Sequence, residues 1–242
     1  MCQICDFPQH ENSRREFLRV LGAATAGYAL LGNAFAAELK VPPKPQNVVS
    51  PDAALALLIA GNKRYVEGVT RRYDFKNERE PLAKGQNPYA AILSCADSRI
   101  APELAFDSAR GDLFVCRVAG NFANDDMVAS LEYAVAELKT PLIMVLGHSA
   151  CGAIAATIQS LKDNSTLPGH LPSLVASLAP AVKASQGKPG DLLDNAIRQN
   201  VSDTVRKLRS ATPILNAAVA GAKLRIVGGV YRLADGHVDI VA

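Results

Sequence analysis

The chain has 242 residues, of which 49% are hydrophobic, and this is enough for the core of one α/β domain with extensions. The formal net charge of +3 is too small to indicate a nucleic-acid partner or an anionic membrane surface. No basic run with interleaved aromatic residues is present. The composition therefore excludes a largely disordered chain and argues against a nucleic-acid-binding protein.

The first 36 residues have the features of a twin-arginine export signal. Ser13-Arg14-Arg15 precedes an apolar stretch from Val20 to Gly32, which closes on small residues around Ala36. This stretch is shorter than the ~20 residues of a membrane span, and a small-x-small ending favours cleavage over a short anchor or a surface helix. We expect residues 1–36 to be removed, with no stable membrane span left after processing. The mature chain should then lie in the periplasm or another extracytoplasmic compartment.

The cysteines argue against a disulfide framework. Cys2 and Cys5 precede the export signal and should be lost with it, which leaves an odd number, namely Cys95, Cys116 and Cys151. An odd number does not suit paired bridges, although the destination is oxidising. Two cysteines in a metal site and Cys116 buried in a strand would account for all three. Because the twin-arginine route carries folded proteins, a metal could be loaded before export.

An extended arm and a helix are expected next. Residues 37–49 contain Pro42, Pro43 and Pro45, which forbid regular structure. Ser50 and Pro51 then favour the start of a helix, which should run over 53–66. Its apolar positions at helical spacing are Ala54, Leu55, Leu58, Ile59 and Tyr65. The segment that follows, as far as residue 85, is expected to be a surface loop.

Strands and helices alternate through the rest of the chain. Expected strands cover 89–94, 111–118 and 142–146, with a terminal hairpin over 224–233 and 237–241. Expected helices cover 102–104, a segment capped by Asp125 or Asp126, a segment from 152, a short piece at 174–184 within a loop, 191–209 and 213–220. This order indicates parallel βαβ units. We therefore predict a single α/β domain over 50–242, with a mainly parallel central sheet flanked by helices and a C-terminal antiparallel hairpin.

Two polar motifs follow predicted strands of this sheet. Cys95, Asp97 and Arg99 come after the first strand, while His148 and Cys151 follow the third. Open α/β sheets place their sites at the carboxyl ends of strands. Residues spaced by one in extended chain point the same way, so Arg99 can hold Asp97 by a forked, charge-assisted hydrogen bond. Alone, each cysteine or histidine would be an ordinary core residue. Together, two thiols and an imidazole indicate a zinc site.

These motifs also carry a family resemblance. Cys95-Ala-Asp97-Ser-Arg99, combined with His148-Ser-Ala-Cys151-Gly152, resembles the paired signature of β-class carbonic anhydrases from about residue 53 to the C-terminus. The resemblance implies that Cys95, His148 and Cys151 bind Zn²⁺ and that Asp97 and Arg99 are the catalytic pair.

The plant-like branch of this family supplies further expectations. Gln86, Phe114 and Tyr133 match that branch, which implies a substrate pocket that they line with Gly152, where residues from two subunits meet. A homodimer or higher homo-oligomer is therefore expected. The match also implies water, rather than the carboxylate of the first motif, as the fourth zinc ligand. Ala153 replaces a usual second glycine, and the segment 117–121 departs from the common Arg-Asn-Val-Ala-Asn.

The expected function is that of an exported zinc lyase. It would hydrate CO₂ reversibly to bicarbonate and a proton through zinc-bound hydroxide, with Asp97 orienting the nucleophile. One alternative keeps the site and changes the substrate to carbonyl sulfide or carbon disulfide. Another is a non-catalytic module with structural zinc, which predicts that Asp97 closes the site as a fourth protein ligand. His170 and Asp107 are expected to be solvated or capping residues.

Overall fold

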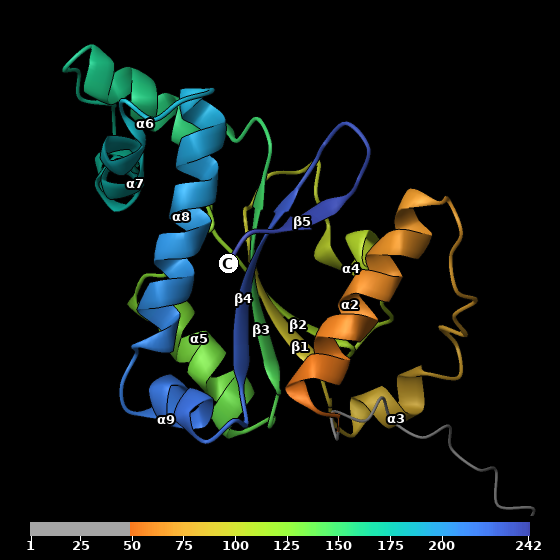
Figure 1. The fold of residues 1–242 in the computed structure, drawn as a ribbon. Helices are drawn as coiled ribbons and strands as arrows, with labels where there is room; N and C mark the ends of the chain where they lie inside the picture. Colours follow the sequence, from red (N-terminus) through yellow and green to blue (C-terminus); the bar gives the residue numbers. More distant parts are fainter. Residues whose placement is uncertain (1–48) are drawn as a thin grey trace, which may run out of the picture. The chain divides into compact units, whose positions relative to one another are not determined.

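The computed structural model describes residues 49–242, which belong to one structural unit. Its centre is a five-stranded sheet in the order β2-β1-β3-β4-β5 (Figure 1). The strands are β1 (Ala90–Ser94), β2 (Leu113–Arg117), β3 (Leu142–His148), β4 (Arg225–Tyr231) and β5 (Val238–Ile240). The first four are parallel, and β5 runs antiparallel to β4. The predicted α/β fold is confirmed, whereas the predicted signal and most of the arm lie outside the described residues.

Helices cover both faces of this sheet (Figure 1). They are α2 (Pro51–Val66), α3 (Arg79–Ala83), α4 (Pro102–Ala105), α5 (Asp125–Ala136), α6 (Gly152–Lys162), α7 (Leu171–Ser185), α8 (Leu192–Arg209) and α9 (Ile214–Ala220). Because side chains alternate along a strand, Leu93 and Val145 pack towards α5 and α8, whereas Ile92 and Met144 pack towards α2. Cover on both faces explains why β1 and β3 are continuous apolar runs.

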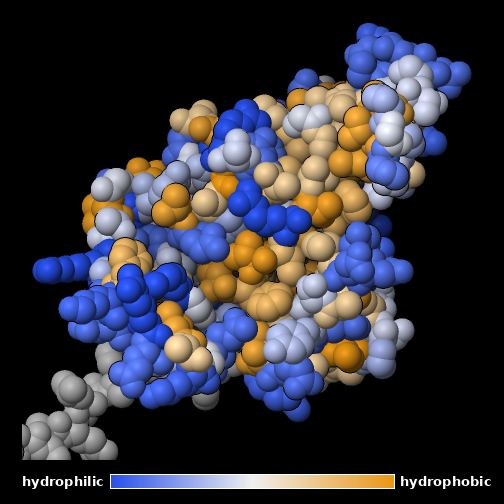
Figure 2. Space-filling model, turned by 180° about the vertical axis from the view of Figure 1, so that it is seen from behind, coloured by the Kyte–Doolittle hydropathy of each residue, from blue (hydrophilic) through white to orange (hydrophobic). Residues whose placement is uncertain are grey.

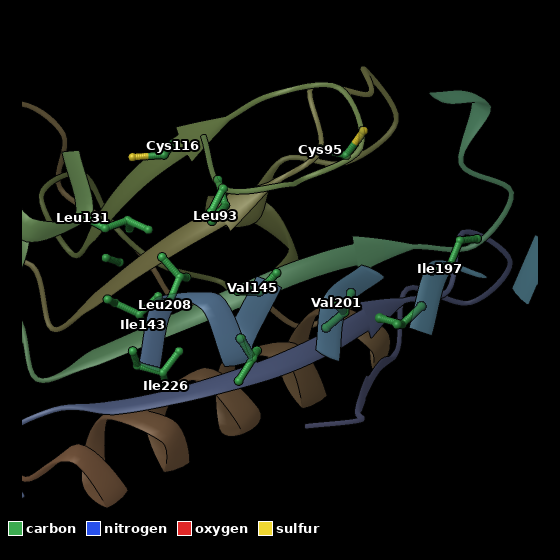
Figure 3. Close-up of a cluster of buried hydrophobic side chains, with 14 of the residues drawn as sticks. Leu93, Cys95, Cys116, Leu131, Ile143, Val145, Ile197, Val201, Leu208 and Ile226 are labelled. Carbon is green, nitrogen blue, oxygen red and sulfur yellow. The ribbon is translucent and has the colours of Figure 1, made fainter. Parts of the chain in front are cut away.

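The strand register sets the two polar motifs side by side. Ser94, the last residue of β1, pairs with Leu146 of β3. Cys95 therefore follows the end of β1 directly, and β3 continues for two residues to end on His148. In Figure 3, Cys95 lies beyond the end of its strand, well apart from Cys116 on β2. Cys116 is buried in a strand, as predicted, and takes no part in the motifs.

β2 forms one edge of the sheet, with no strand on its outer side among residues 49–242. Leu113, Phe114 and Val115 are only half-buried there. Figure 2 views the molecule from behind and shows apolar residues gathered in the middle of that face. An unpaired strand edge can pair with another chain, and an exposed apolar patch is typical of an interaction surface.

Among the described residues, no helix combines the length and apolarity that crossing a bilayer requires.

Several boundaries differ from the sequence-based prediction. The expected surface loop before β1 contains α3, and the expected short piece at 174–184 is the longer helix α7. The N-cap of α5 is Asn124, whose side chain accepts the Met127 N–H at 3.0 Å, so capping by Asp125 or Asp126 was wrong. On α2, the cap at Ser50 is confirmed. Ile59 and Tyr65 of α2, which were expected on its apolar face, are 51% and 38% exposed and so lie outside the core.

Asn62 connects α2 to the C-terminal hairpin. Its side chain is 4% exposed and donates to the carbonyls of Ala105 and Gly236 at 2.9 and 2.8 Å. It also accepts the Val238 N–H at 2.9 Å. Three buried hydrogen bonds to backbone make this asparagine a structural residue on the face of the sheet that α2 covers.

Candidate metal centre

The structure brings Cys95, His148 and Cys151 together. Their ligand atoms all lie within 4.8 Å of one another, and all three residues are buried. Cys95 follows β1, His148 ends β3, and Cys151 is the N-cap of α6. Among residues 49–242, these three side chains form the candidate metal-binding group. The predicted convergence of the two motifs is therefore observed.

The histidine is held in the tautomer that a metal ligand needs. Its Nδ1 lies 2.9 Å from the Ser149 carbonyl, which can only accept a hydrogen bond, so Nδ1 carries the proton. Nε2 of His148 is then a bare acceptor, and it is buried without a hydrogen-bond partner in the described part of the chain. Buried polar atoms are normally paired. An unpaired imidazole nitrogen beside two thiols is the arrangement that a cation would satisfy.

The contact between the two thiols shifts their pKa values in opposite directions. A hydrogen bond from Cys151 lowers the pKa of Cys95, whereas the same contact together with burial raises the pKa of Cys151. One thiolate thus stabilises the protonated form of the other, because two anions cannot share a buried site without compensation. A divalent cation between them would favour both thiolates, since metal binding deprotonates cysteine.

Asp97 and Arg99 form the predicted pair. Arg99 donates from Nε to Asp97 Oδ1 at 2.9 Å and from Nη2 to Oδ2 at 2.7 Å. These bonds hold the pKa of the Asp97 carboxyl well below its usual value, so that it remains an acceptor through the neutral range. Asp97 Oδ2 lies 3.7 Å from His148 Nε2, at the edge of the ligand cluster. Arg99 also contacts the Ala150 carbonyl at 3.3 Å and so joins the two motifs.

Sequence reasoning missed the role of Arg117, the last residue of β2. Its Nε donates to the Cys95 carbonyl at 3.1 Å, and Nη2 donates to the carbonyls of Asp97 and Ile100 at 2.7 and 2.9 Å. One guanidinium therefore fixes the whole loop that carries the first motif. A signal was available, because an arginine that ends a strand beside the motif's strand lies within reach of the loop.

The predicted pocket residues divide into two groups. Gly152 lies at the centre, directly after Cys151, and is exposed with open space around its Cα. Phe114 and Tyr133 contact each other, with ring centroids 6.2 Å apart. Phe114 pairs with Ala91 of β1, four residues before Cys95, so about 13 Å of strand separates it from the ligand cluster. Within one chain, this aromatic pair does not line the metal centre.

Gln86 also lies away from the ligand cluster within one chain. It is exposed and precedes β1, whereas Cys95 follows the opposite end of that strand. Gln86, Phe114 and Tyr133 thus occupy the amino-terminal side of β1 and β2 and the adjoining helix α5. The structure of one chain therefore does not bring Gln86, Phe114 and Tyr133 to the ligand cluster.

Comparison with known proteins agrees with this geometry. The family model described as carbonic anhydrase matches residues 90–238. The chain is 38% identical to carbonic anhydrase 2 of Mycobacterium tuberculosis over 189 residues, which cover 78% of this chain and 91% of that protein. The chain belongs to the β-class carbonic anhydrase family. It is also 36% identical to the carbonic anhydrase of Mycolicibacterium smegmatis, over 79% of this chain and 93% of that protein.

Solved structures of the family share the fold. The β-carbonic anhydrase CcaA is 30% identical and superposes with a TM-score of 0.59, covering 78% of this chain and 98% of that one. A tetrameric β-carbonic anhydrase of Sordaria macrospora, 23% identical, has a TM-score of 0.60 and covers 78% of this chain and 98% of that one. The second likeness concerns the fold alone. This chain is thus an enzyme of the carbonic anhydrase family.

The donor set fits the zinc ion that β-carbonic anhydrases use. Zinc takes thiolate sulfur at about 2.3 Å and imidazole nitrogen at about 2.0–2.1 Å in a tetrahedron, which puts ligand atoms roughly 3.5–3.8 Å apart. The sulfurs of Cys95 and Cys151 and Nε2 of His148 all fall within 4.8 Å of one another, so small shifts complete that geometry. Two soft donors and one imidazole also match zinc chemically.

Proposed function

We propose that this enzyme catalyses the reversible hydration of CO₂ to bicarbonate and a proton, with zinc held by Cys95, His148 and Cys151. One observation supports this most strongly. The bare, buried Nε2 of His148 lies with two thiols beside the carboxylate of Asp97, which Arg99 locks as an acceptor. The residues therefore provide three ligands and one oriented acceptor, and this leaves one coordination position for solvent or substrate.

The residues of the chain have distinct tasks in this reaction. Zinc, when bound, supplies a Lewis acid that lowers the pKa of water towards ~7. Asp97 accepts a hydrogen bond from the attacking water and so aims its lone pair at the carbon of CO₂. Arg99 keeps Asp97 ionised and fixed in place. Arg117 holds the backbone of the loop on which both depend.

The contacts of Asp97 oppose the structural-zinc alternative. That alternative needs Asp97 as a fourth protein ligand, yet Arg99 engages both of its oxygens. Recruiting the carboxylate to a metal would break a forked, charge-assisted pair. An open fourth position also agrees with the plant-like branch, which we infer for this chain from Gln86, Phe114 and Tyr133.

We infer a homodimer or a higher homo-oligomer in which a second copy completes the pocket. Gln86, Phe114 and Tyr133 lie away from the ligand cluster of their own chain. Tyr133 is 50% exposed, and the half-buried β2 edge lies beside it with an apolar surface (Figure 2). A β-carbonic anhydrase from Sordaria macrospora is a tetramer. Contact across this surface would supply apolar walls for an uncharged substrate.

Removal and return of the metal tests the proposed reaction. Dialysis against a zinc chelator should abolish CO₂ hydration, measured by stopped-flow pH change, because no other group in the cluster can activate water. One equivalent of zinc should restore the rate, whereas magnesium, which prefers oxygen ligands, should not. Rates with carbonyl sulfide and carbon disulfide, measured on the same sample, compare the alternative substrates. Full hydration by metal-free protein would refute the proposal.

We propose that the chain is exported by the twin-arginine route, on the basis of Arg14, Arg15 and the small residues that end at Ala36. Replacing both arginines by lysine keeps the charge but removes the paired guanidinium groups. This variant should accumulate inside the cell at full length, whereas the native chain is recovered outside the cytoplasmic membrane, starting near Ala37. Cell fractionation with N-terminal sequencing measures both. Equal export of the two chains would contradict this route.

A further inference from the structure

We propose that Asn200 of α8 is a positioning residue for the metal centre. It holds the loop between β2 and α5 so that the Gly120 N–H donates to the sulfur of Cys95. The proposal rests on the proposed zinc function, because the sulfur concerned is a zinc ligand there. Asn200 lies 80 residues from Gly120 in the sequence, and no motif of the family signature includes it.

The hydrogen bond to sulfur depends on an unusual backbone turn. Gly120 N lies 3.3 Å from Cys95 Sγ in a buried contact. Gly120 has φ +85° and Asn121 has φ +42°, so two successive residues adopt the left-handed conformation. L side chains rarely adopt this φ, and a Cβ added at Gly120 would also lie 2.8 Å from Leu178 Cδ1, so that the leucine side chain would have to shift. The turn therefore requires glycine, and it must be held from outside.

α8 supplies the external support. Asn200 is 3% exposed, and its Nδ2 donates to the Gly120 carbonyl at 2.8 Å. Seven residues later on the same helix, Lys207 Nζ donates to the Ala123 carbonyl at 2.6 Å. α8 therefore donates hydrogen bonds to two carbonyls of the loop, and Asn200 binds the carbonyl of Gly120, the residue whose N–H donates to Cys95.

This support affects the metal through the electron density on sulfur. An N–H donor withdraws charge from a thiolate, so Cys95 donates less to zinc and leaves it a stronger Lewis acid. Without the Asn200 amide, the buried Gly120 carbonyl loses its partner and the strained turn relaxes towards other conformations. The N–H of Gly120 then moves away from Cys95, and the ligand loop is less well pre-organised for metal.

The test compares Asn200→Leu with Asn62→Leu. Both positions are buried asparagines that donate to backbone carbonyls, at 3% and 4% exposure, but Asn62 lies on the face of the sheet that α2 covers. Asn200→Ala is a second variant that avoids adding apolar bulk. Each protein is loaded with zinc for affinity measurement against a chelating indicator, and with cobalt for its thiolate-to-metal charge-transfer spectrum. Thermal unfolding records the stability of each.

We expect both Asn200 variants to bind zinc about 10-fold more weakly than the native protein. Their cobalt charge-transfer band should move to longer wavelength, because a sulfur without its N–H donor holds its electrons less tightly. Asn62→Leu should lower the unfolding temperature yet keep the native band and affinity. A native band and affinity in folded Asn200→Ala would overturn the proposal, as would the same band shift in Asn62→Leu. If the native chain bound neither zinc nor cobalt, the proposed zinc-dependent function would itself be refuted.

Discussion

Replacing Cys151 with serine should yield a protein without bound zinc and without measurable CO₂ hydration. The serine hydroxyl is a poor zinc ligand near neutral pH, so two donors remain where three are needed. Zinc affinity should fall by more than about 100-fold, which exceeds the cost of losing a supporting residue around a metal site. Zinc content per chain, determined by elemental analysis, and stopped-flow hydration assays measure the two effects.

Cys116→Ser is the matched control for this substitution. Cys116 is also a buried free cysteine, 8% exposed, but it lies on β2 away from the ligand cluster (Figure 3). This variant should keep one zinc ion per chain and the native rate, even if it unfolds at a lower temperature. Stoichiometric zinc in Cys151→Ser, or equal loss of zinc in both variants, would refute the ligand role of Cys151.

Asp97→Asn should leave zinc bound and lower the hydration rate by about 100-fold or more. The amide keeps the size of the carboxylate but replaces one acceptor oxygen by a donor nitrogen. That nitrogen faces either the guanidinium of Arg99, which donates to both oxygens of Asp97, or the attacking water. The native pKa of Asp97 is already below its ordinary value, so the loss should be similar at every pH near neutrality rather than a displaced pH profile.

A second aspartate–arginine pair provides the control for Asp97. Asp107 is 7% exposed, pairs with Arg64 of α2 and accepts the Thr70 hydroxyl at 2.6 Å, and neither partner belongs to the metal motifs. Asp107→Asn should reduce stability but keep the native rate per folded molecule. Native hydration by Asp97→Asn with zinc bound would show that this carboxylate does not orient the nucleophile.

The parts of the site that follow from short stretches of sequence were predictable. Cys95, Asp97 and Arg99 share one extended segment, so their spacing alone predicts their common direction and the Arg99–Asp97 pairing. His148 and Cys151 follow a continuous apolar strand, and the alternation of strands and helices predicts that two such strands are parallel neighbours. The order of the strands then brings the motifs together.

The supporting contacts of the site were not predictable in this way. Gly120 donates to a sulfur 25 residues earlier and Asn200 to a carbonyl 80 residues earlier, and such contacts leave no pattern of spacing. Only Arg117 left a signal, through its place at the end of the strand beside β1. Asp107 was expected to be solvated or capping, but it is buried because Arg64 and several donors compensate its charge. α7 begins at Leu171, three residues before the expected start, because Pro172 lies in the first helical turn, where its missing N–H costs no hydrogen bond.

The centre joins the ends of two strands whose ligands, Cys95 and His148, lie 53 positions apart in the chain. A bound ion would therefore act as a cross-link in a unit whose described cysteines are all free. Chain-entropy arithmetic for a closed loop of this size gives about 4 kcal/mol of restriction on the unfolded ensemble. Zinc binding and folding would then be thermodynamically coupled, and the metal-free chain would have the lower free energy of unfolding.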